Sequence, residues 1–178
     1  MSSAPNPTVV VALGGNALLP RGERPEAATQ LRAARKAASA LAPLVVEYDL
    51  VVTHGNGPQV GLLALMGDAY TDVDPYPLDV LDAESEGQIG YVIELELDNA
   101  IEGRDTVALI TRVVVDEHDP AFVAPTKFIG PLYDEGRARA LERERDWSVR
   151  PDGDAWRRVV PSPEPRRIVQ LPAIRRLV

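Results

Sequence analysis

The chain has 178 residues, a formal net charge of −8 and 45% hydrophobic residues, which suffice for one globular domain with a substantial core. It contains no cysteine, which excludes disulfides, thiolate nucleophiles and zinc–thiolate sites. No apolar run approaches a membrane span in length, and the N-terminal MSSAPNPT lacks the regions of a signal peptide, so we expect a cytoplasmic protein with no membrane partner.

Charge is unevenly distributed along the chain. Residues 1–135 carry a net charge of −13, whereas residues 136–178 carry +5. A nucleic-acid interface would combine a basic domain with interleaved aromatic residues, so the basic segment is interpreted as a solvated surface and no nucleic-acid partner is expected. Only Lys36 and Lys127 among the 19 basic residues are lysines, which singles both of them out.

The first predicted element is a buried strand over residues 9–13, VVVAL, which leads directly into Gly14, Gly15 and Asn16. A helical segment over residues 26–48 follows, and Pro43 is expected to kink or split it. Glycines after a strand allow a ligand to approach bare backbone N–H groups. This first corner is therefore a candidate for anion binding.

A second corner lies in VVTHGNGPQVG, residues 51–61. A strand over residues 51–53 ends at His54, and Gly55, Asn56 and Gly57 then lead to Pro58, which suits the first turn of a helix. The N-terminus of a helix beside a glycine turn attracts anions.

The helical crossover between the two predicted strands makes them parallel neighbours, so both corners should lie at the same edge of one sheet. Neither corner is a Walker A loop or a GxGxxG motif.

The following elements complete an α/β pattern. A helix from residue 58 to about residue 66 precedes an amphipathic helix over residues 82–101, in which apolar residues recur every four positions. Residues 106–115, TVALITRVVV, predict a third buried strand. The predicted fold class is therefore α/β, with a mostly parallel sheet covered by helices over residues 1–115.

Residues 116–160 are expected to form a small inserted, lid-like subdomain. Its irregular first part precedes a short helix near residues 135–146 and a β-hairpin around RPDGD, whose arms open with Trp147 and Trp156 and should bring them together. Residues 161–178 should then return to the core through a strand edge at RRIVQL and the first turns of a helix that stops without a cap.

Two histidines carry weaker signals. His54, next to the second corner, is interpreted as a hydrogen-bonded residue that shapes the loop. His118 lies among Asp116, Glu117 and Asp119, but adjacent loop positions rarely converge on one ion. No metal site is predicted.

Five segments carry a family resemblance: ALGGNALL, VVTHGNGPQVG, ESEGQIGY, PTKFIGP.Y and WRRVVPSPEP. In this order and spacing they resemble carbamate kinase, of the amino acid kinase superfamily, from Val9 to the end of the chain. The resemblance implies that this chain is the N-terminal portion, without the C-terminal nucleotide-binding half. Two positions depart from the family pattern: Glu86 stands where glutamine is frequent, and Phe128 where proline is usual.

The resemblance also implies roles for individual residues. Lys127 would be catalytic and contact phosphoryl or carbamate oxygens. Gln88 could face the substrate or a partner subunit. The remaining substrate-binding residues would surround the transferred phosphoryl group, and they are Gly14, Gly15, Asn16, Gly55, Asn56 and Gly57.

The activity implied is reversible phosphoryl transfer from ATP to carbamate, which gives ADP and carbamoyl phosphate. The chain would supply the carbamate side, Mg²⁺ would enter with the nucleotide, and the protein would be a homodimer of arginine metabolism. The 178-residue chain alone is expected to be inactive. Two alternatives stay open: a non-catalytic half-domain that binds an anion or dimerises, and a related kinase that acts on another carboxylate.

Overall fold

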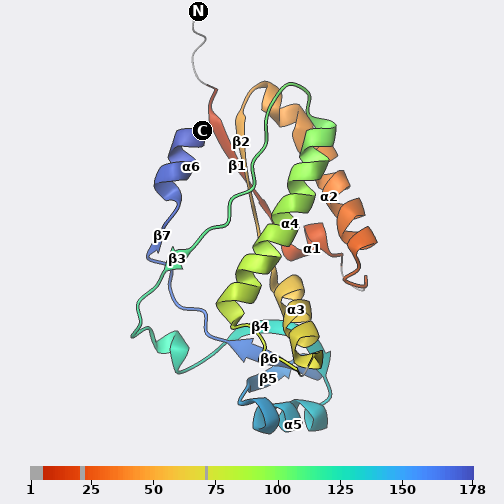
Figure 1. Cartoon of the computed structure of the whole chain (residues 1–178), viewed down its shortest axis with the longest axis vertical. Helices are drawn as coiled ribbons and strands as arrows, with labels where there is room; N and C mark the ends of the chain where they lie inside the picture. Colours follow the sequence, from red (N-terminus) through yellow and green to blue (C-terminus); the bar gives the residue numbers. More distant parts are fainter. Residues whose placement is uncertain (1–5, 21–22, 71) are drawn as a thin grey trace, which may run out of the picture. The chain divides into compact units, whose positions relative to one another are not determined.

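A computed structural model describes residues 6–20, 23–70 and 72–178 (Figure 1). The chain consists of two compact units. The first unit contains the residues up to 56, residues 84–110 and residues 171–178. The second unit contains residues 57–83 and 111–170. The division of the chain into a core and a lid-like subdomain over residues 116–160 stays a prediction.

The first unit is built on two parallel strands. Its elements in chain order are β1 (Thr8–Leu13), α1 (Gly15–Leu18), α2 (Ala27–Leu41), the 3₁₀ helix η1 (Ala42–Val46), β2 (Asp49–His54), α4 (Leu78–Ala100) from residue 84 onward, and α6 (Leu171–Leu177). Strand β1 pairs with β2 from Thr8 opposite Asp49 to Leu13 opposite His54. Both strands, their parallel pairing and the split at Pro43 confirm the sequence prediction.

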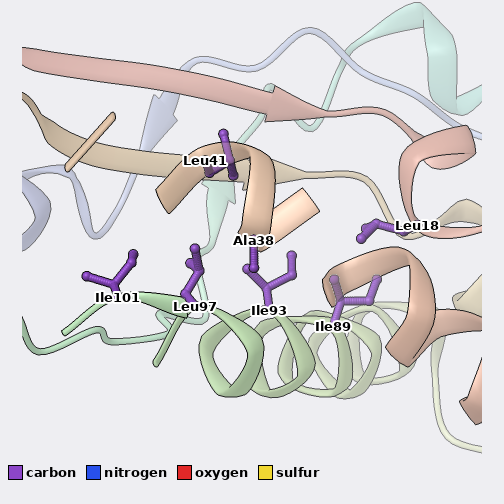
Figure 2. Packing of buried hydrophobic residues seen from close by; sticks show 7 residues of the cluster. All are labelled: Leu18, Ala38, Leu41, Ile89, Ile93, Leu97 and Ile101. Atoms are coloured by element: carbon purple, nitrogen blue, oxygen red, sulfur yellow. The ribbon is translucent and has the colours of Figure 1, made fainter. Parts of the chain in front are cut away.

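Helices α1, α2 and α4 cover one face of this strand pair. Figure 2 shows the buried cluster between them, which consists of Leu18, Ala38, Leu41, Ile89, Ile93, Leu97 and Ile101. Val11 and Leu13 of β1 pack against the cluster, whereas Val10, which points to the opposite face, is 63% exposed. The four-residue spacing on α4 therefore marks the buried stripe, as predicted.

An ion pair also joins α2 to α4. The guanidinium of Arg35 donates two hydrogen bonds to the carboxylate of Glu96, at 2.9 and 3.0 Å. Glu96 is almost completely buried, and the pairing satisfies both of its oxygens, as burial of a charged group requires.

Residues 106–115 do not form the expected third parallel strand. Only Val113–Val114 (β3) is a strand, and it pairs antiparallel with β7 (Arg167–Ile168). Further upstream, Ala108 packs on α4, where a Cβ built on Gly90 would lie 3.0 Å from the Ala108 Cβ. The prediction was wrong because an apolar run becomes a strand only beside a partner strand, and among the described strands only β7 pairs with this run, at Val113–Val114. Most of its large apolar side chains are therefore exposed.

The second unit combines helices with short antiparallel sheets. Its elements are α3 (Gly57–Ala69), the start of α4, β3, the 3₁₀ helix η2 (Pro120–Phe122), β4 (Lys127–Tyr133), α5 (Glu135–Arg145), β5 (Ser148–Asp152), β6 (Ala155–Val160) and β7. The three-stranded sheet has the order β4-β6-β5. Strand β4 was missed in the sequence because it contains a Gly-Pro pair and an irregular register between Ile129 and Tyr133.

The predicted hairpin is present as β5 and β6, but its tryptophans do not face each other. Pro151 lies opposite Trp156, and Trp147 precedes the first paired residue at the open end of the hairpin. Each indole ring instead stacks with an arginine at 4.3 Å: Arg158 lies over Trp147 and Arg139 over Trp156. The expectation that the rings meet was wrong because the register separates them along the hairpin.

Candidate functional site

Gly14 and Gly55, the first glycines of the two corners, lie side by side in the first unit. Because β1 and β2 are parallel and Leu13 lies opposite His54, Gly14 and Gly55 both follow the carboxyl ends of these strands and lie beside each other. Helix α1 begins at Gly15, and its first backbone hydrogen bond runs from the Ala17 N–H to the Gly14 carbonyl, at 2.8 Å. The predicted juxtaposition is confirmed for Gly14 and Gly55, whereas Gly57 belongs to the second unit.

Space is open around the corner glycines. A Cβ built on Gly14, Gly15 or Gly55 would meet no described atom within 4 Å, and none of these residues has a positive φ. Neither internal packing nor a left-handed backbone therefore explains the glycines in the part of the chain that the structure describes. Exposed backbone between the end of a strand and the start of a helix is an arrangement in which N–H groups can contact an anion.

The side chain of Asn56 is fixed by a residue of α4. Its Nδ2 donates a hydrogen bond of 2.8 Å to the Oγ of Ser85, which is completely buried. Ser85 belongs to the ESEGQIGY segment but was not singled out in the sequence. A small polar residue three positions before Gln88, on the same face of a helix, was the available signal.

Gln88 lies one turn after Ser85 and is exposed. Its Nε2 donates a long hydrogen bond of 3.5 Å to the Oε1 of Gln30 on α2, which is buried. The structure thus places Gln88 in the same unit as Gly14, Gly55 and Asn56, on the face of α4 whose Ser85 binds Asn56.

Two residues next to the second corner keep buried polar atoms without a hydrogen-bond partner among the described atoms. They are the Nδ1 of His54 and the Oε1 of Gln59. The expected hydrogen bond that would shape the loop is therefore not found at the Nδ1 of His54. Gln59, which is 3% exposed, was not recognised as a candidate in the sequence.

Gly57 and Lys127 belong to the second unit. Helix α3 begins at Gly57 itself, one residue before the predicted start, and Pro58 occupies its first turn. Lys127 is the first residue of β4, opposite Val160 of β6, and its side chain is exposed. Helix α3 packs on β4, so one unit holds both of these predicted site residues.

Over residues 6–20, 23–70 and 72–178, no three His, Asp or Glu side chains are grouped as a metal site. The acidic cluster around His118 has a local structural role instead. The Asp119 carboxylate accepts hydrogen bonds from the backbone N–H groups of Ala121 and Glu164, at 2.8 and 2.9 Å, which lower the pKa of Asp119. No described helix is long and apolar enough to cross a membrane.

Comparisons with known proteins point to one family, although no protein-family model matches the chain. The carbamate kinase of Rhizobium meliloti is 53% identical over 171 residues, which cover 96% of this chain and 53% of that protein. The carbamate kinase of Escherichia coli is 50% identical, with coverage of 96% of this chain and 58% of that protein.

Solved structures agree with the sequence relatives. The structure of carbamate kinase from Giardia lamblia bound to citric acid matches with a TM-score of 0.86 and 38% identity, over 97% of this chain and 58% of that one. The chain therefore spans little more than half the length of these relatives. Over the part of their length that it spans, the chain is homologous to these carbamate kinases.

Proposed function

We propose that this chain forms the carbamate and carbamoyl phosphate side of a carbamate kinase, which transfers a phosphoryl group reversibly between ATP and carbamate. The observation that supports the proposal is the register of the parallel strands. Leu13 lies opposite His54, so Gly14 and Gly55, both with open space around them, lie side by side. The homology to carbamate kinases supplies the reaction.

In the forward direction, a carbamate oxygen forms a bond to the γ-phosphorus of ATP while the bond to the departing ADP oxygen breaks. Charge spreads over the phosphoryl oxygens, so catalysis depends on positioning and electrostatic stabilisation. The backbone N–H groups of both corners would hold these oxygens, and Gln88 would contribute to the carbamate side. The Lys127 ammonium, a compact point charge, would neutralise the transferring group.

We assign ATP binding to the portion of the relatives that this chain does not cover. A solved Giardia lamblia carbamate kinase is bound to AMP-PNP, which shows that this relative holds an ATP-like nucleotide. The described residues of the chain offer no cluster that fits Mg²⁺, so Mg²⁺ is proposed to enter with the nucleotide phosphates and no step in this chain is derived through it. A homodimer is proposed as the assembly.

The test is ATP formation from ADP and carbamoyl phosphate by a fusion protein. The fusion joins this chain to the part of the Rhizobium meliloti carbamate kinase outside the match. Turnover with carbamoyl phosphate is expected, and the assay in the forward direction should form ADP from ATP with carbamate but not with glutamate or aspartate. A folded fusion that phosphorylates glutamate or aspartate, or none of these acids, would contradict the proposal.

A further inference from the structure

Helix α3 and strand β4 meet in the second unit through two glycines. A Cβ built on Gly61 would lie 2.4 Å from the Cα and 2.5 Å from the N of Gly130. Side chains do not tolerate such distances to backbone atoms, so the approach depends on glycine at position 61. Gly130 has a φ of 71°, a left-handed conformation that also favours glycine.

The packing around this contact leaves little freedom. Ala64 and Leu65 of α3 and Ile129 and Pro131 of β4 line a small, partly open pocket beside this contact, with room for about one water molecule, about 10 Å³. Because the atoms that a Cβ on Gly61 would meet belong to the backbone of Gly130, the clash can be relieved only by a shift of α3 or β4. The position of β4 along α3 is therefore set by how closely Gly61 and Gly130 approach.

Each glycine is close in sequence to a residue of the proposed phosphoryl site. Gly61 lies four residues after Gly57, a rise of about 6 Å along a helix. Gly130 lies three residues after Lys127, about 10 Å along a strand. The α3 span is helical and Lys127–Ile129 is regularly paired strand that ends next to Gly130, so a shift at the glycine contact moves Gly57 and Lys127 relative to each other.

We propose that Gly61 is a positioning residue: its backbone contact with Gly130 sets the place of Lys127 relative to the first turn of α3. The inference rests on the proposed function, which assigns both Lys127 and Gly57 to the phosphoryl site. It adds a specific reason why an alanine at position 61 would impair that site without touching the substrate.

Because the chain has few lysines, NMR can follow the chemical environment of Lys127 directly. Lys127 and Lys36 are its only lysines, and Lys36 is exposed on α2 in the first unit. With lysine labelled with ¹³C at Cε, the 178-residue chain gives one NMR signal for each residue. We expect the Lys127 signal to shift saturably on titration with inorganic phosphate, while Lys36 serves as the internal reference and stays in place.

Gly61→Ala should weaken the apparent phosphate affinity reported by Lys127 by on the order of tenfold or more, because misplacement by about 1 Å is costly at such sites. Gly67→Ala is the matched control, since it lies on the same helix and its Cβ would meet Pro75 at 3.6 Å, an ordinary contact. Both substitutions raise helix propensity equally, so their difference reports the glycine contact.

Ala64→Val keeps the proposal testable if Gly61→Ala does not fold. Ala64→Val adds two methyl groups to the small pocket beside the glycine contact. It should displace α3 from β4 less than Gly61→Ala does, and it should weaken the phosphate response of Lys127 less. The inference would be overturned, while the proposed function remained, if a folded Gly61→Ala variant bound phosphate with the parent's affinity at Lys127. If Gly61→Ala is unfolded, the same result for Ala64→Val would overturn it. No Lys127 response in the parent chain would instead remove Lys127 from the proposed site and the inference with it.

Discussion

Asn56, at the second glycine corner, donates a hydrogen bond of 2.8 Å from its Nδ2 to the Oγ of Ser85, which is completely buried on α4. This bond ties the end of β2 to the helix that supplies the main buried stripe of the first unit. The rotamer of a predicted substrate-binding residue is thus fixed by the core, which is how a site becomes organised before its ligand arrives.

Removal of the Ser85 hydroxyl should destabilise the fold. Ser85→Ala leaves the partly buried Asn56 amide without this acceptor, and such a loss costs about 1–3 kcal/mol in the free energy of unfolding. Urea denaturation measures it, and Ser39→Ala, an exposed position on α2, is the matched control. Equal stability of the two variants would mean that the Asn56–Ser85 bond contributes nothing to the fold.

The buried stripe of α4 makes a second prediction, with two leucines on one helix. Leu97 is 6% exposed within the cluster of Figure 2, and Leu95 is 38% exposed. Leu97→Ala should lower the free energy of unfolding by about 2–5 kcal/mol, the range for cavities in well-packed cores. Leu95→Ala should lower it by clearly less. Denaturant midpoints that fall equally would contradict the packing described for α4.

Asp119 predicts an acid-sensitive contribution to stability. Its carboxylate accepts backbone hydrogen bonds from Ala121 and Glu164, and these bonds lower its folded-state pKa. A lowered folded-state pKa gives stability that is present above the unfolded-state pKa, about 3.9, and is lost as the pH falls through the folded value.

Asp119→Asn should therefore be less stable than the parent chain near pH 7, and the difference should shrink below about pH 4. Denaturation curves at a series of pH values measure it, with Asp154→Asn, an exposed position in the hairpin turn, as control. A difference that stays constant down to pH 3 would show that the ionised carboxylate is not what stabilises this loop.

The sequence was informative where a local pattern and a strong physical preference coincide. The four-residue period that includes Ile89 and Ile93 defined α4, and the run at residues 9–13 followed by glycines defined β1 and its corner. The parallel pairing with β2 followed from the helical crossover, which allows few other arrangements.

The sequence was uninformative where an element depends on its partner. Residues 106–115 were predicted to form a buried strand, yet among the described strands only β7 pairs with them, at Val113–Val114, and most of their large apolar side chains are exposed. Strand β4 is held by β6 despite an internal Gly-Pro pair that disfavours strands. The Asn56–Ser85 bond joins residues that are far apart in sequence, and no periodicity encodes such a contact.

The last prediction concerns turnover. The chain spans little more than half the length of its carbamate kinase relatives, and phosphoryl transfer requires two reactants held in line. The 178-residue chain alone should therefore form no measurable ATP from ADP and carbamoyl phosphate, whereas the fusion with the remaining Rhizobium meliloti segment should do so. Robust turnover by the short chain would refute the assignment of nucleotide binding to the uncovered portion.

Within the active fusion, Lys127→Ala should lower the rate by a factor on the order of 10²–10³, the typical cost of losing one group that stabilises transition-state charge. Lys36→Ala is the matched control, because it removes the chain's other lysine from the exposed surface of α2 and should leave the rate unchanged. The loss should fall on kcat rather than on KM alone, since the role proposed for Lys127 is to stabilise the charge that develops during phosphoryl transfer. A Lys127→Ala fusion as fast as the Lys36→Ala control would exclude Lys127 from the mechanism while leaving the carbamate kinase reaction itself intact.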